Sequence, residues 1–215
     1  MPTPKPPQQV RAQRTRRQLL EAAQRVFADG GYEGATVDDI AEAAGCSKGA
    51  YYFHFASKEE ALVALLDEWA AYWSDRLTQA LDTRLPPAVA LFTLLNALLS
   101  VEAEGGWEPQ LVLEFWSHAE RSAPARRRLL QAQRSWRRLL AKAIAQAQQA
   151  GALATDVRPE AAAATLLALR DGLLVQACVG APPPGPGELR TAVLTALLGA
   201  GAESASASRR QARTG

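Results

Sequence analysis

Residues 47–55 carry side chains suited to contact with a nucleic-acid backbone. If the segment is helical, at about 100° per residue, one half of it presents four positions together: Lys48, Gly49, Tyr52 and Phe53. A lysine supplies a cation for phosphate, a glycine lets the backbone come close, and a tyrosine hydroxyl donates a hydrogen bond. The pattern therefore indicates a surface that faces a DNA groove.

The same segment could instead form a buried aromatic cluster, because aromatic rings commonly fill cores. Four rings fall close together: Tyr51, Tyr52, Phe53 and Phe55. What favours DNA is the combination of the flanking cations Lys48 and Lys58 with a tight turn before the helix and a basic N-terminal arm. We therefore expect this helix to face DNA.

The charge of the N-terminal segment supports a DNA-facing helix, whereas the net charge of the whole chain does not. Residues 1–20 contain five Lys or Arg and no acid, whereas residues 1–60 contain eight basic and eight acidic residues and so have no net charge. A basic arm of this kind attracts phosphate. The arm, and not the net charge of +2, therefore favours a DNA partner.

Local signals place the helix in a helix-turn-helix. Thr36 is a predicted N-cap followed by acids, and the short helix that it opens ends at Gly45, whose missing Cβ permits a left-handed cap. Ser47 can cap the next helix only two residues later, and Ser57 to Glu60 form a capping box that opens another. An apolar stripe predicts a longer helix over about residues 11–29 in front of them. Two short helices joined by a tight turn and braced on both sides match this motif.

Residues 14–62 resemble the DNA-binding domain of the tetracycline-repressor (TetR) family, helix for helix and without gaps. The matching residues are Phe27, Gly31, Tyr32, Thr36, Ile40, Ala41, Ala44, Gly45, Ser47, Lys48, Gly49, Tyr52, His54, Phe55, Ser57, Lys58 and Glu59. Residues 14–62 make up about a quarter of the chain. The resemblance implies a transcriptional regulator, most simply a repressor, that binds palindromic operator DNA as a homodimer and is released by a small, largely apolar effector.

The predicted operator-contacting residues are Thr36, Ser47, Lys48, Gly49, Tyr52, Phe53, His54 and Lys58. The resemblance implies this role for all of them except Phe53, which is included because it shares one half of the helix with Lys48 and Tyr52. Most of these would anchor phosphates, with Gly49 and the start of its helix nearest the bases. Cys46 stands where a small apolar residue is common, Tyr51 where an aliphatic one is common, and Phe53 where a tyrosine is frequent. Phe53 thus removes one phosphate hydrogen bond, Tyr51 could be core, and His54 could equally be packed or solvated.

The rest of the chain predicts an all-α fold of about nine helices, because strand signals are almost absent and apolar residues repeat at helical spacing. Proline and glycine breakers separate helices expected over residues 57–85, 88–101, 110–119, 125–150, 160–179 and 188–198. We expect a disordered basic, proline-rich arm at 1–10, a DNA-binding domain at 11–56, a ligand-binding and dimerisation domain at 57–199 and a disordered tail at 200–215. A basic stretch at 121–142 is interpreted as the solvated face of an amphipathic helix, with DNA or an anionic ligand group as alternatives.

The last two predicted helices are expected to pair with their counterparts in a second copy. Residues 161–179 are apolar on nearly all sides, and residues 189–198 form a second apolar ridge that a chain of this size could not bury completely. The family resemblance implies the same four-helix interface. Two-fold symmetry would then require a palindromic operator.

A ligand pocket is expected in the second domain, because it holds more large aromatic residues than a small bundle needs and a few polar residues among them. The candidate ligand-binding residues are Trp69, Trp73, Phe92, Asn96, Trp107, Phe115, Trp116, His118, Trp136, Arg170 and Gln176. Each aromatic ring could instead belong to the core. Arg170 and the adjacent Asp171 could serve the pocket or pair across the dimer interface.

Other classes of function find less support. The sequence contains no recognisable nucleophile–base pair, metal-ligand set or paired-carboxylate motif, so we expect neither an enzyme nor a cofactor or metal. The two cysteines, Cys46 and Cys178, are far apart, which fits a reducing cytoplasm. The apolar run at 161–179 has two charged residues at its centre, so we expect no membrane span. A ligand-binding helical module with degenerate DNA binding stays open, and would lack the salt-sensitive DNA affinity of a regulator.

Overall fold

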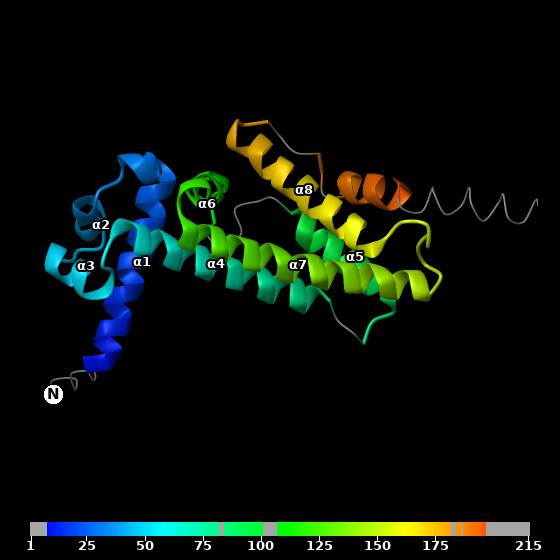
Figure 1. Ribbon diagram of the computed structural model, residues 1–215, viewed down its shortest axis with the longest axis horizontal. Helices are drawn as coiled ribbons and strands as arrows, with labels where there is room; N and C mark the ends of the chain where they lie inside the picture. Colours follow the sequence, from blue (N-terminus) through cyan, green and yellow to red (C-terminus); the bar gives the residue numbers. More distant parts are fainter. Residues whose placement is uncertain (1–7, 82–83, 101–106, 182–183, 186, 197–215) are drawn as a thin grey trace, which may run out of the picture. The chain divides into compact units, whose positions relative to one another are not determined.

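The computed structural model describes residues 8–81, 84–100, 107–181, 184–185 and 187–196 (Figure 1). Most of them are helical, and no strand occurs in these ranges. The labelled helices are α1 (Gln8–Gly34), α2 (Val37–Ala43), α3 (Lys48–His54), α4 (Lys58–Ala80), α5 (Pro87–Leu99), α6 (Pro109–Arg121), α7 (Ala123–Gln149) and α8 (Pro159–Cys178). Residues 187–196 form one more helical segment. The predicted all-α fold of about nine helices is therefore confirmed.

Helix α1 differs from its prediction at both ends. It begins at Gln8, so the last three residues of the arm predicted as disordered are helical, because no breaker separates them from Arg11. Gly31, with φ 70° and ψ 162°, breaks the helix near the predicted stop, and helical residues continue to Gly34. Residues 1–7 of the predicted arm, the predicted tail at 200–215, and the predicted helix ends at 101 and 197–198 lie outside the described residues.

The chain packs as two compact units, which we call the head and the body. The head comprises residues 1–70 and 105–130, and so contains α1 to α3, α6, the first part of α4 and the start of α7. The body comprises residues 71–104 and 131–215, with α5, α8 and the rest of α4 and α7. Two long helices thus contribute to both units. The predicted domain boundary at residues 56–57 stays a prediction.

The core of the head is built on the apolar stripe of α1. Leu19, Leu20 and Phe27 are at most 2% exposed, as are Ile40 of α2 and Tyr51 of α3. Helix α1 packs against α2, α3 and α6, and Figure 1 shows α2 and α3 beside it. Isolated helices of seven residues are unstable in water. Packing on α1 therefore stabilises the two short helices of the motif.

Helix α8 contributes a large part of the core of the body. It buries Leu166, Leu167 and Leu173 and packs against α5, which lies beside it in Figure 1. Its length and composition would suffice for a membrane span. One such helix is weak support for a span, because a helix buried in a protein core meets the same criterion. Arg170, only 3% exposed, lies in the middle of this helix.

Helix α7 confirms the interpretation of the basic stretch as a solvated face. Its cations are all exposed: Arg126, Arg127, Arg128, Arg134, Arg137, Arg138 and Lys142. Leu129, Trp136 and Leu140 are buried on its other side. The Nε atom of Arg128 lies 3.4 Å from a carboxylate oxygen of Asp67. The helix is thus amphipathic, as its periodicity predicts.

Candidate nucleic-acid interface

The turn between α2 and α3 is fixed by local caps. Thr36 Oγ1 accepts a hydrogen bond from the Asp39 N–H at 3.2 Å, and the Asp39 carboxylate accepts one from the Thr36 N–H at 2.8 Å, which completes a capping box. Gly45 adopts the left-handed φ of 64° that the turn requires. Ser47 Oγ then accepts from the Ala50 N–H at 3.1 Å and caps α3. The predicted helix-turn-helix caps are confirmed.

The exposed half of α3 is the half predicted to meet DNA. Lys48 and Gly49 are exposed, as is the capping residue Ser47. Tyr52 is 50% exposed and Phe53 is 77% exposed. Two neighbouring aromatic rings open to solvent mark a surface that a partner can cover. All five of these predicted residues are therefore accessible to a partner.

The other aromatic residues of this segment belong to the core. Tyr51 is fully buried, and its hydroxyl donates to the carbonyl oxygen of Ser57 at 3.1 Å. Its ring centroid lies 5.6 Å from that of the buried Phe55. Burial raises the pKa of Tyr51, so its hydroxyl stays protonated. The expectation that Tyr51 could be core is confirmed, and the aromatic cluster is divided between core and surface.

Two of the predicted DNA contacts have carboxylate partners within the head. The Lys48 Nζ atom donates to Asp38 at 2.8 Å, and both side chains are more than half exposed. This hydrogen bond and the charge of Asp38 raise the pKa of Lys48. The Thr36 hydroxyl donates to Asp39 at 2.7 Å, and hydrogen bonds from Thr36 lower the pKa of Asp39. Sequence reasoning had assigned neither carboxylate to a contact residue.

Lys58 is bound to the backbone of the head. Its ammonium donates to the carbonyl oxygens of Tyr32 at 2.6 Å and Ala35 at 2.8 Å, and lies 4.2 Å from the centre of the Tyr32 ring. Two of its three N–H donors are thus used inside the protein. At the start of the same helix, Ser57 Oγ accepts from the Glu60 N–H at 3.1 Å, which is one half of the predicted capping box. The Glu60 carboxylate accepts from the Ala56 N–H at 2.6 Å instead of from Ser57.

His54 is half-buried at the end of α3. Its ring lies edge-on to the Phe53 ring, with centroids 5.0 Å apart. Burial, and then the charge of Arg16, lower the pKa of His54 and favour the neutral imidazole. The Arg16 guanidinium itself lies 5.2 Å from the centre of the Phe55 ring.

The N-terminal part of α1 is rich in exposed basic residues. Four arginines of its first turns are exposed: Arg11, Arg14, Arg16 and Arg17. Arg17 pairs with Glu21 at 3.0 Å. The basic arm predicted from the sequence is therefore partly a basic helix, which holds its cations at fixed spacing along one rigid element.

The predicted ligand residues fall in both units. Five belong to the head: Trp69, Trp107, Phe115, Trp116 and His118. The Phe115 ring packs against Trp69 and Trp107, with centroid distances of 5.5 Å and 6.5 Å. Trp69 and Phe115 are almost fully buried, whereas Trp116 is 37% exposed.

His118 lies in a polar network that joins α6 to α1 and α4 within the head. Its ring is 4.5 Å from that of Tyr32, and its Nε2 atom is 3.5 Å from a carboxylate oxygen of Glu59. The same oxygen accepts from Ser122 Oγ at 2.5 Å. The hydrogen bond from Ser122 and the neighbouring His118 lower the pKa of Glu59. Sequence reasoning missed Glu59 and Ser122 as partners, because they are far apart in the chain.

The remaining candidates belong to the body. The Arg170 guanidinium stacks 4.1 Å from the centre of the Trp73 ring and lies 3.5 Å from Asp171. Burial lowers the pKa of Arg170 to about 10 and raises the pKa of Asp171. Trp136 donates from Nε1 to Ser74 Oγ at 2.9 Å. Arg170 therefore has partners within its own chain.

Three further candidates are more open to solvent. Phe92 is 40% exposed, and the Arg190 guanidinium lies 4.1 Å from the centre of its ring. Arg190 also donates to Asn96 Oδ1. Gln176 is exposed on α8. Phe92 and Asn96 thus contact the helical segment 187–196.

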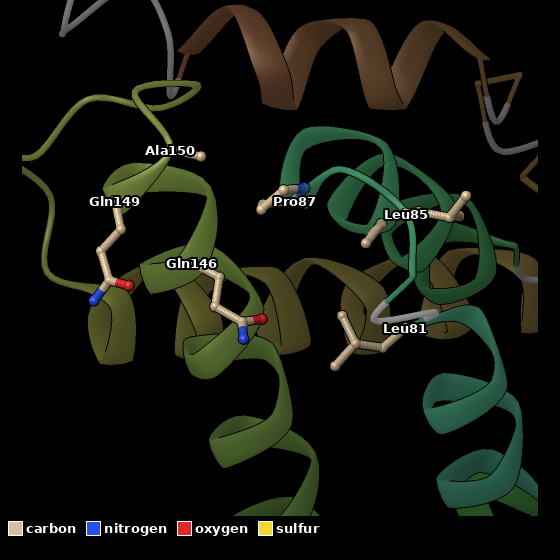
Figure 2. A pocket seen from close by; sticks show the side chains of 7 residues that line it. Leu81, Leu85, Pro87, Gln146, Gln149 and Ala150 are labelled. Carbon is tan, nitrogen blue, oxygen red and sulfur yellow. The ribbon is translucent and has the colours of Figure 1, made fainter.

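Two pockets of the body lie away from these candidates. One, of about 300 Å³, is lined by Leu81, Leu85, Pro87, Ala90, Gln146, Gln149 and Ala150. Figure 2 shows the Gln146 amide directed toward Leu81 and the Gln149 amide pointing away. A second, of about 210 Å³, is lined by Val157, Ala161, Ala162, Thr165, Leu166, Leu169, Val193 and Ala196. No predicted ligand residue lines either of these two pockets.

Two family models match the chain. The one described as "Bacterial regulatory proteins, tetR family" matches residues 19–65. The one described as "BetI-type transcriptional repressor, C-terminal" matches residues 87–201, which is more than half of the chain. The first match includes the whole of the α2–turn–α3 segment.

Similar proteins of known name include two repressors. The HTH-type transcriptional repressor DhaR of Mycobacterium sp. (strain GP1) is 28% identical over 185 residues, which cover 85% of this chain and 92% of DhaR. The HTH-type transcriptional repressor AcnR of Corynebacterium efficiens is 45% identical over 65 residues, which cover 30% of this chain and 35% of AcnR. The match to AcnR thus spans about a third of that protein.

Solved structures share the fold over most of the chain. A TetR transcription regulator from Haloarcula marismortui superposes with a TM-score of 0.75 at 25% identity, covering 86% of this chain and 99% of that chain. A protein from Saccharomonospora viridis, solved in complex with choline, gives a TM-score of 0.74 at 26% identity, covering 84% and 94%.

Proposed function

Because this chain belongs to the TetR family of ligand-responsive transcriptional regulators, we propose that it is a repressor that binds operator DNA through α3 as a homodimer. A small, largely apolar effector releases it from the DNA. The exposed half of α3 carries the proposal, because it presents a lysine, a glycine and two aromatic residues on a capped helix whose buried residue is Tyr51. This role is that of a regulator and not an enzyme, and it places the protein in the cytoplasm.

A stripe of small and apolar residues on α8 supports the homodimer. Its exposed positions follow one another at spacings of three or four: Ala161, Thr165, Ala168, Gly172, Val175 and Val179. A stripe without charge favours a protein partner over water, and its small residues allow close approach. We infer that α8 and residues 187–196 pair with the same elements of a second copy. Such a dimer is two-fold symmetric and requires a palindromic operator.

A small-molecule effector is supported by similarity to a protein solved with choline. Its largely apolar character rests on the aromatic residues of the predicted set, of which Trp73 and Trp136 are buried in the body. Choline is therefore a reasonable first compound to titrate, beside apolar compounds of similar size. Neither a metal nor a cofactor is part of the proposal.

Helix α4 is proposed to carry the signal, since it has residues in both units. At its first residue, Lys58 binds the carbonyl oxygens of Tyr32 and Ala35, just before α2 begins. A shift of α4 would therefore move α2 and α3 as well. The effector acts only through its different affinities for the two positions of the helix.

Fluorescence anisotropy with palindromic DNA from the region upstream of its own gene tests the proposal. We expect binding that weakens steeply as salt rises, because phosphate contacts release counterions. Lys48→Ala and Tyr52→Ala should each weaken binding roughly five- to tenfold.

The matched control is Lys142→Ala, which removes an exposed cation from α7. Unchanged affinity in both α3 variants would remove these residues from the interface. A wild-type protein that ignores all tested DNA, or binds it without salt dependence, would favour the ligand-binding module without DNA binding.

A further inference from the structure

Two adjacent carboxylates in the first turn of α2 each bind a side chain predicted to contact DNA. Asp39 binds Thr36, and this pair is part of the capping box that begins the helix. Asp38 binds Lys48 across the turn, with 2.8 Å between Nζ and the carboxylate oxygen. The capping box explains Asp39. It does not explain why a second carboxylate holds the lysine of the DNA-facing helix.

We propose that Asp38 limits the DNA affinity of this chain by competing with DNA phosphate for the ammonium of Lys48. The inference rests on the proposed DNA binding through α3. It assigns a role to an acid that neither the helix caps nor the predicted contact set requires.

Exposure makes the exchange feasible. The Lys48 side chain is 55% exposed and that of Asp38 is 65% exposed, so water and salt reach both groups. Ion pairs of this kind are weak and easily exchanged. A lysine that moves from Asp38 to a phosphate leaves the carboxylate unpaired beside a polyanion. Lys48 should then add less affinity than a lysine without an acidic partner.

The charges of α3 make this exchange measurable. The sequence of the helix, KGAYYFH, has one lysine, no arginine and no acid. The exposed side chains beside Lys48 on this face, Tyr52 and Phe53, have no formal charge at neutral pH. A change at Asp38 therefore acts mainly through a single cation.

Salt titration of the full-length protein tests the proposal, with the operator duplex and a scrambled duplex of equal length as probes. We expect Asp38→Asn to bind both duplexes about three- to tenfold more tightly at ~0.1 M salt. The slope of log Kd against log salt should become steeper by about one unit, because each additional neutralised phosphate releases about one counterion. Asp38→Glu should restore values close to those of the wild type. Asp38→Ser is a second neutral variant that still suits a helix start.

Two controls separate exchange at Lys48 from a general effect of charge. Glu42→Gln makes the same charge change at an exposed position of the same helix and should leave the affinity nearly unchanged. In a Lys48→Met background, Asp38→Asn should lose its effect, because the shared cation is gone.

Weaker binding by Asp38→Asn would make Asp38 an orienting partner and overturn the proposal. So would an equal gain in Glu42→Gln, or a gain that persists without Lys48. A wild type that binds neither duplex contradicts the proposed function itself, whereas a wild type that binds while Asp38→Asn is unchanged contradicts only the competition.

Discussion

At the scale of the residue, Lys58 shows how a side chain can match a motif and still have a second task. The resemblance predicts a phosphate contact, and one N–H of its ammonium stays available for that. The other two bind the Tyr32 and Ala35 carbonyl oxygens, so the lysine also closes the loop between α1 and α2. Sequence alone could not predict this, because Lys58 and Tyr32 meet only through the fold of the head.

Replacing Lys58 separates its two tasks. We expect Lys58→Met to lower the free energy of unfolding by about 1–3 kcal/mol, since two charge-assisted hydrogen bonds to half-buried carbonyl groups are lost. Urea unfolding followed by circular dichroism measures this. Lys142→Met is the control, as an exposed lysine of α7. Unchanged stability together with a shallower salt slope of DNA binding would make Lys58 a phosphate contact only.

At the scale of the element, short-range signals were the most predictable. Thr36, Gly45 and Ser47 act on residues at most four positions away, and the structure has the caps that they predict. Partners across elements were not predictable. His118 is a good example, because its aromatic setting suggested a ligand pocket, whereas the structure places it against Tyr32 and Glu59 in the head.

Glu59 should make the link between α6 and α4 sensitive to acid. Its folded pKa is lowered, chiefly by the hydrogen bond from Ser122, so it stabilises the fold above its ordinary pKa of about 4.5. This stabilisation is lost as the pH falls through the folded value. We expect Glu59→Gln to be less stable than the wild type at pH 7 and to lose less stability between pH 5 and pH 3.

Urea midpoints measured from pH 7 to pH 3 check this. Glu120→Gln, which changes an exposed carboxylate of α6, should follow the wild-type curve. If Glu59→Gln also followed that curve, the bond to Ser122 would not contribute to stability.

At the scale of the whole molecule, the periodicity of the sequence predicted how many helices form but not how they group. Apolar residues at helical spacing identify the buried face of each helix. They do not indicate which other helix that face packs against. Trp69 and Trp73 are both predicted ligand residues on α4, and the division between head and body falls between them. Packing between distant segments decides such assignments.

The exposed stripe of α8 predicts that the protein is a dimer. We expect Ala168→Glu to convert the proposed dimer into a monomer, because each copy would bury an unpaired charge in the interface. Analytical ultracentrifugation measures the change, and operator binding should weaken because two half-sites are no longer held together. Gln131→Glu, on the exposed face of α7, is the control. A dimer that survives the change at Ala168 would place the interface elsewhere.

Helix α3 exposes the residues at positions 48, 49, 52 and 53 and buries Tyr51, while caps and α1 hold it in place. Within α3, the residues proposed to meet DNA are therefore almost distinct from the residue that builds the core. After gene duplication, substitutions at these exposed positions can therefore change the DNA preference of one copy while every intermediate variant still folds. The same separation makes α3 a natural segment for grafting a new DNA preference onto an otherwise unchanged chain.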